Sequence, residues 1–174
     1  MDTEKMGRSR WCVRLMAVLV AAASMVSSAL ADETCSRGTW FEVTGDVGNP
    51  TRLSKDEFLL LPSSDIRTTT NWSKGEKVDY LGPRLTSLLA LAKAAEPWKS
   101  LTLTAVNDYS VTISREAVTK YQPIVSHTMN GQLHERKKYG PTWLILPRDE
   151  FNELKGPTGD AMFIWGLCKV TVKR

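Results

Sequence analysis

The chain has 174 residues, of which 42% are hydrophobic, and its formal net charge is +4. This length is typical of one domain that buries a substantial core. The first 31 residues carry four basic and two acidic side chains, so the remainder has a charge of +2 (+4 minus +2). It has no dense basic stripe of the kind that binds nucleic acid, and we expect no nucleic acid among its partners.

Residues 1–31 have the pattern of a secretion signal peptide. An apolar run from 15 to 26 precedes a small-x-small cleavage site, Ala29-Leu30-Ala31. That run is shorter than the roughly 20 residues of a membrane-spanning helix, and the basic residues before it include no adjacent arginine pair. These basic residues are Lys5, Arg8, Arg10 and Arg14. We predict cleavage after Ala31, export of the unfolded chain to the periplasm, a single domain over 32–174, and no insertion of that domain into the membrane.

Cleavage would leave two cysteines, Cys35 and Cys168, in an oxidising compartment. An even pair there predicts a disulfide, the alternative being two unpaired thiols. Neither cysteine has the CxxC spacing or the nearby histidine of a catalytic or metal-binding thiol.

Short strands and helices are expected to alternate in the first half of the chain. A strand over 40–44 ends in a turn formed by Gly45-Asp46 and Gly48-Asn49-Pro50. Ser54 with Glu57 forms a capping box for a helix that Pro62 ends. A Thr-rich strand over 65–71 brings Trp72 to its end. After a loop at 73–76 and a strand at 78–81, Pro83 opens a second helix that runs to about residue 93.

The second half is predicted to be richer in strands. Segments 101–105 and 111–113 form a hairpin, and Ser114 caps a short helix that reaches Lys120. Further strands are expected at 124–129, 142–146 and 163–172. Asp149 and Glu150 are expected to cap a helix after Pro147. Many short strands with two or three helices predict an α+β fold with a mixed sheet.

The stretch from Ser126 to Pro147 has the features of a small-ligand pocket. A Met-Asn-Gly turn, a polar basic run and a Gly-Pro corner lie between two apolar strands, so polar side chains and turn backbone should gather beside a buried sheet. The alternative is that these are ordinary turns and that the basic run is only solvated.

In this order the segments resemble the molybdopterin-binding domain of the sulfite oxidase family, and in particular its small, exported, single-domain members. The similarity covers residues 41–172. It rests on FEVTGDVGNP-TRLSKDEFLLLP, IRTTTNW, YLGPRLTSLLALA, NDYSVTIS and MNGQLHERKKYGPTWLILP. The resemblance implies the SUOX fold, with a pterin pocket lined by the loops of these segments.

The chain departs from the catalytic members of that family at the metal and phosphate positions. Those members ligate molybdenum with a cysteine from the loop after the strand that matches 66–70, where this chain has Thr69-Thr70-Asn71-Trp72. They also hold the phosphate end of the cofactor with an arginine where this chain has Trp143. A basic residue or histidine is replaced by Tyr139. Because no thiol is present there to ligate molybdenum, and because an indole cannot replace a bidentate guanidinium at the phosphate end, we expect pterin as the ligand without molybdenum.

A pterin is flat and aromatic and has an amide-like edge, so its site needs an aromatic face and a hydrogen-bond acceptor. Trp72 and Tyr109 are expected to supply the face and Asp108 the acceptor. Each has an ordinary alternative role: Trp72 could fill the core, Tyr109 could pack on the sheet, and Asp108 could form a turn. Whether Trp143 faces the pocket is left open. The full set of expected ligand-binding residues is Asn71, Trp72, Asp108, Tyr109, Met129, Asn130, Arg136 and Tyr139.

Three functions are considered. The first is a periplasmic pterin-binding protein without catalysis, which relays its ligand state to a membrane-bound signalling partner such as a cyclic-di-GMP enzyme or a histidine kinase. The second is a molybdopterin-dependent oxidoreductase of the sulfite oxidase family. The third is a metal or haem carrier that uses His127 and His134, the only two histidines, although a lone histidine is more often structural.

Overall fold

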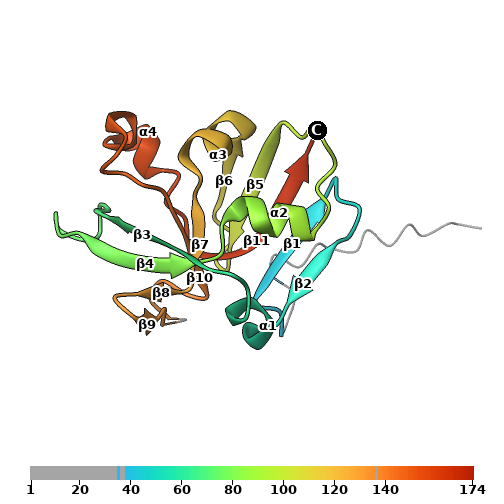
Figure 1. Ribbon diagram of the computed structural model, residues 1–174, viewed down its shortest axis with the longest axis horizontal. Helices are drawn as coiled ribbons and strands as arrows, with labels where there is room; N and C mark the ends of the chain where they lie inside the picture. Colours follow the sequence, from blue (N-terminus) through green and yellow to red (C-terminus); the bar gives the residue numbers. More distant parts are fainter. Residues whose placement is uncertain (1–34, 36–37, 136) are drawn as a thin grey trace, which may run out of the picture. The chain divides into compact units, whose positions relative to one another are not determined.

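The computed structural model describes residue 35 and residues 38–135 and 137–174 (Figure 1). The predicted signal peptide and Arg136 lie outside the described residues. Along the described chain the elements are β1 (Phe41–Gly45), β2 (Thr51–Leu53), α1 (Lys55–Leu59), β3 (Ser64–Thr68), β4 (Val78–Gly82), α2 (Leu85–Leu91), β5 (Ser100–Ala105), β6 (Ser110–Ser114), α3 (Arg115–Tyr121), β7 (Ile124–Ser126), β8 (Thr128–Met129), β9 (Gln132–Leu133), β10 (Thr142–Ile145), the 3-10 turn Asn152–Leu154, α4 (Pro157–Asp160) and β11 (Trp165–Lys173).

Strand β11 is the centre of a seven-stranded mixed sheet. Along one edge it pairs antiparallel with β5, which in turn pairs with β6 in the predicted hairpin. Its other edge is shared by two strands: β10 pairs antiparallel with its first residues, and β1 runs parallel to its second half. The sheet continues to β2 beyond β1 and to β7 beyond β10. The long red arrow of β11 passes between these strands in Figure 1.

A smaller antiparallel sheet has the order β3-β4-β8-β9. The sequence predicted a single strand over 124–129, but the chain changes sheets at His127: β7 pairs with β10, whereas β8 pairs with β4. The predicted Met-Asn-Gly turn then joins β8 to β9, with Asn130 at φ 49° and Gly131 at φ 76°. Two consecutive residues with positive φ are typical of a tight hairpin turn whose twist matches the strands.

Local capping signals are confirmed. The predicted capping box is present at the start of α1. The Ser54 hydroxyl accepts a hydrogen bond from the backbone N–H of Glu57, and the Glu57 carboxylate accepts one from the backbone N–H of Ser54. At α3 the Ser114 hydroxyl accepts a hydrogen bond from the N–H of Ala117. Each cap satisfies backbone donors that have no partner within the helix, which fixes where these helices begin.

The prediction that Asp149 caps a helix after Pro147 is wrong. The Asp149 carboxylate instead accepts hydrogen bonds from the backbone N–H and the hydroxyl of Thr69, at 3.1 and 2.6 Å. Residues 148–150 form a turn, and Glu150 caps no helix either. The same contact explains why β3 ends at Thr68 and not at residue 71, since the Thr69 backbone bonds to a side chain and not to a strand.

Strands β2 and β9 and helix α4 were not predicted. Each has four residues or fewer. Elements this short carry no periodicity in the sequence, and β2 exists because β1 offers it three paired positions.

The core lies between and beside the two sheets and includes Phe41, Phe58, Leu85, Leu101, Leu103, Leu144 and Val170, all buried. The predicted disulfide joins Cys35 to Cys168 in β11, across a sequence separation of 133 residues. Of the helices in the described ranges, none combines the length and the apolar character that a membrane span requires.

Gly82 allows β4 and β7 to meet. A Cβ at this position would lie 2.1 Å from the carbonyl oxygen of Val125 and 2.6 Å from the Cα of Ser126, and backbone cannot move aside cheaply. We expect Gly82→Ala to lower the free energy of unfolding by about 1–3 kcal/mol. Gly156→Ala is the control, because a Cβ there meets nothing within 4 Å. Equal effects of the two changes in urea unfolding would contradict this account.

Candidate functional site

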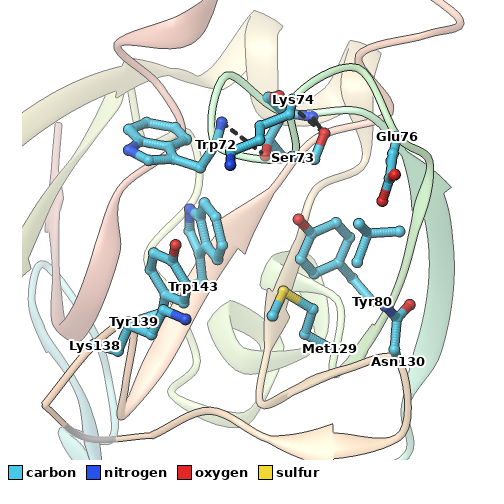
Figure 2. Close-up of a pocket in the computed structure, with 12 residues that line it drawn as sticks. Trp72, Ser73, Lys74, Glu76, Tyr80, Met129, Asn130, Lys138, Tyr139 and Trp143 are labelled. Carbon is cyan, nitrogen blue, oxygen red and sulfur yellow. Dashed lines mark hydrogen bonds between the residues drawn. The ribbon is translucent and has the colours of Figure 1, made fainter.

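A cavity of about 290 Å³ opens between the loop after β3, strand β4, the β8–β9 turn and the start of β10 (Figure 2). Its volume lies at the lower end of the range for small-ligand pockets, roughly 300–1,000 Å³, which suits one bicyclic ring system. The lining residues are Thr70, Trp72, Ser73, Lys74, Glu76, Val78, Tyr80, Met129, Asn130, Lys138, Tyr139 and Trp143.

The rings of three residues, Tyr139, Trp72 and Tyr80, surround Trp143, which is 1% exposed. Tyr139 stacks on it with ring centroids 4.8 Å apart and an angle of 20° between the planes. Trp72 and Tyr80 meet it edge-on, with centroids at 5.5 and 5.6 Å. In Figure 2, Trp143 and Tyr139 form one wall, Tyr80 and Met129 stand opposite, and Trp72 lies above. The cavity therefore offers flat aromatic surface for a planar ligand.

Trp143, one of the residues that line this cavity, has a buried donor without a partner. The indole N–H of Trp143 is buried and makes no hydrogen bond to any described residue. An unpaired buried donor is costly. Five buried side-chain N or O atoms of the described residues have no partner, and among them only the Trp143 nitrogen belongs to a residue that lines this cavity. A ligand acceptor at this atom would satisfy it.

Charged groups border the same cavity. In Figure 2 the Glu76 carboxylate lies on the same side of the cavity as Tyr80, and the Lys74 side chain lies at the top of the view. Lys138 lies over the Tyr139 ring, 5.3 Å from its centroid. Burial raises the pKa of Tyr80, so its hydroxyl stays protonated and can donate or accept a hydrogen bond.

Arg148 and Asp149 fix the loop that carries Trp72. Arg148 donates to the Thr69 hydroxyl, to the side-chain oxygen of Asn71 and to Asp160, at 3.1–3.3 Å. Asp149 holds Thr69 and also pairs with Lys77 at 3.5 Å. These partly buried charge-assisted bonds hold the loop from outside the cavity, so Trp72 is presented on a positioned backbone.

A second cavity of about 390 Å³ lies beside Trp72 and is more apolar. Trp72 is 41% exposed and borders both cavities. The second cavity is lined by Asn71, Trp72, Asn107, Tyr109, Asp160, Ala161, Phe163, Ile164 and Trp165.

The predicted ligand-binding residues are distributed over both cavities. Met129, Asn130 and Tyr139 line the first, Asn71 and Tyr109 the second, and Trp72 both. Asp108 is in the β5–β6 turn with φ 67° and lines neither cavity. Arg136 lies outside the described residues.

The sequence reasoning missed Lys74, Glu76 and Tyr80 as lining residues, and it left Trp143 undecided. Glu76 and Lys74 sit in a polar loop with no motif, so nothing local marks them. Tyr80 has a sequence signal in hindsight, because it alternates with exposed residues in β4 and so faces inward.

The two histidines are buried, and the Nε2 atom of each lies within hydrogen-bonding distance of a serine hydroxyl. Nε2 of His134 is 3.1 Å from the Ser126 hydroxyl, and Nε2 of His127 is 3.3 Å from the Ser63 hydroxyl. Burial, followed by repulsion from His127, lowers the pKa of His134 to about 4. No group of three or more metal-ligating side chains occurs among the described residues, so the carrier hypothesis gains no support from geometry.

No known protein family matches this sequence, and no curated protein is significantly similar to it. The structure, however, is similar to the crystal structure of the sulfane dehydrogenase SoxCD from Paracoccus pantotrophus, with a TM-score of 0.60. The sequence identity is 14%, and the match covers 78% of this chain. The fold is that of a sulfite oxidase-family protein. This confirms the predicted mixed sheet with few short helices. The chain matches only 38% of the length of the SoxCD chain.

The residues present do not fit the molybdenum centre that the predicted family implies. In the loop from Thr69 to Trp72 no side chain is a thiol, and the two cysteines of the described chain are joined to each other. At the phosphate position, Trp143 and Tyr139 form a stacked pair that offers no guanidinium. The aromatic walls and the unpaired indole N–H do fit a planar heteroaromatic ring.

Proposed function

We propose that this protein binds a pterin in the first cavity, without catalysis, as a small exported protein of the sulfite oxidase fold. The observation that carries the proposal is the buried, unpartnered N–H of Trp143 in a cavity walled by Tyr139, Tyr80 and Trp72. The ring of a pterin would lie against the aromatic wall, and one of its acceptor atoms would take the indole N–H.

Glu76 supplies the complementary group. The amino and ring N–H donors of a pterin need a nearby acceptor, and a carboxylate bound to two donors is a charge-assisted contact. The amide of Asn130 adds a further polar group at the cavity wall, although its oxygen already accepts the N–H of Asp79. A cavity with aromatic faces, one donor and one carboxylate would favour a pterin over an aliphatic ligand.

We further propose that the mature protein acts in the periplasm and reports its ligand state to a membrane-bound signalling protein, such as a cyclic-di-GMP enzyme or a histidine kinase. The support is the signal-peptide pattern of residues 1–31 and the poor fit to a metal centre. Trp72 links the ligand to the surface, because it borders the cavity and is 41% exposed.

Titration of the mature protein with unsubstituted pterin, followed by quenching of tryptophan fluorescence, tests the site. Trp143→Phe keeps the aromatic face and removes the donor, and we expect affinity to fall about tenfold. Glu76→Gln removes the charge, and the expected loss is about 10- to 100-fold. Trp72→Ala should weaken binding by on the order of 1 kcal/mol through lost ring contact.

Asp108→Asn is the matched control. It makes the same acid-to-amide change as Glu76→Gln, but at a turn residue that lines neither cavity. Unchanged affinity in Glu76→Gln together with a loss in Asp108→Asn would move the pterin edge away from the first cavity.

The alternative function is a molybdopterin-dependent oxidoreductase, which the fold relationship favours. Molybdenum content and released pterin fluorescence, measured on one denatured sample of periplasmic protein, separate the two. Pterin without molybdenum is the expected result. Molybdenum near one atom per chain would overturn the binding proposal and require a metal ligand other than cysteine.

A further inference from the structure

Strand β6 is an open edge of the seven-stranded sheet. It pairs only with β5, and its sequence is Ser110-Val111-Thr112-Ile113-Ser114, with no charge and no proline. The other edge strands in the described chain are protected. Strand β3 carries Asp65 and Arg67, β2 is three residues long and contains Arg52, and β9 has two residues. Strand β7 is buried, and its Val125 N–H donates to the Pro83 carbonyl. Natural proteins blunt exposed edges in these ways because unpaired backbone groups recruit another strand.

The hydrogen-bond phase of β6 leaves its backbone ready for pairing. The Ala105 N–H donates to the Tyr109 carbonyl, and the Arg115 N–H donates to the Lys99 carbonyl. In an antiparallel pair the bonded positions alternate, so the odd-numbered residues of β6 face β5. The N–H and C=O groups of Ser110 and Thr112, and the N–H of Ser114, therefore point away from the sheet. The side chains of these three residues are exposed.

The sequence of β6 is a chemical palindrome about Thr112. If two copies pair antiparallel with Thr112 opposite Thr112, their outward backbone groups fall in hydrogen-bonding register. Ser110 of one copy then faces Ser114 of the other, and Val111 faces Ile113. Val111 and Ile113 lie on the core side, opposite Leu103 and Leu101 of β5. Thr–Thr and β-branched pairs at facing positions both stabilise sheets, and no like charges meet within the strand.

We propose that a second copy of this chain docks on β6, forming a two-fold symmetric dimer with one continuous sheet. Identical patches must be self-complementary in such a dimer, and the Ser-Val-Thr-Ile-Ser pattern meets that condition at every position. Five paired residues bury less surface than a permanent interface needs, so the dimer forms reversibly and depends on concentration. This inference is independent of pterin binding.

Sedimentation equilibrium of the mature protein, from about 1 µM to about 1 mM, tests the pairing, because weak dimers dissociate in this range. The weight-average mass should rise towards twice the monomer value. Thr112→Lys places two ammonium groups opposite each other, and Thr112→Glu does the same with carboxylates, so each variant alone should stay monomeric. Mixed in equal amounts, the two variants should dimerise again, because the facing charges are then opposite.

Thr119→Lys is the control, since Thr119 is exposed on α3 and outside the edge strand. It should dimerise like the wild type. Circular dichroism and pterin titration check that each variant is folded. A wild-type protein that is folded by circular dichroism but remains monomeric at about 1 mM, or a Thr112→Lys variant that still dimerises, would overturn the proposal whether or not pterin binds.

Discussion

Removing the Cys35–Cys168 disulfide is expected to lower the free energy of unfolding by about 5 kcal/mol. The bond closes a loop across a sequence separation of 133 residues. The chain-entropy model gives about this value for such a loop, because the cross-link restricts the unfolded chain. Since domains are typically stable by about 5–15 kcal/mol, the loss would leave a marginal protein.

Urea unfolding of the oxidised mature protein, of the same protein with reductant, and of the Cys35→Ala/Cys168→Ala variant measures this effect. The reduced protein and the variant should agree and should both show a larger dependence on urea, because their unfolded states are more expanded. If reductant leaves the midpoint unchanged, the bond does not contribute in this way. Because the disulfide does not persist in a reducing compartment, we also expect low yields of folded protein from a reducing cytoplasm.

Acidification from pH 7 to pH 4 is expected to cost about 3 kcal/mol of stability through His134 alone. The side chain is 6% exposed, and burial lowers the pKa of His134 from 6.5 to about 4 in the folded protein. Between these values the unfolded chain binds a proton that the folded chain excludes, so stability falls as the pH falls. Above pH 6.5 the contribution is complete, and below pH 4 it is gone.

His134→Gln removes the titrating group while keeping a side chain that can bond to the Ser126 hydroxyl. The stability of this variant should change less between pH 7 and pH 4, by about the same 3 kcal/mol. Burial also lowers the pKa of His127, so His127→Gln should reduce the remaining slope in the same direction. A wild-type slope retained in both variants would assign the acid sensitivity to other groups.

The β5–β6 hairpin carries the proposed pairing strand β6 and also borders the second cavity. The turn of this hairpin carries Asp108 and Tyr109, and Tyr109 lines the second cavity. In a dimer paired through β6, the two turns would flank the shared strands.

The local chemistry of the sequence determined much of the fold. Ser54 and Ser114 cap helices because their hydroxyls reach backbone donors only a few residues away. The Asn130-Gly131 turn forms because both residues tolerate positive φ. The alternation in 101–105 and 111–113 was enough to predict a hairpin, and the even cysteine pair after residue 31 was enough to predict the disulfide.

Tertiary structure decided what the sequence left open. Asp149 leaves its expected helix cap because Thr69, 80 residues earlier, offers it two donors. The strand at 124–129 divides at His127 because two sheets compete for it. Trp143 faces a cavity, and Glu76 joins it there, because β10 and the loop after β3 meet only in the folded chain. Capping, turns and alternation act over a few residues and can be read from the sequence, whereas a binding site depends on contacts between segments whose distance in sequence carries no local signal.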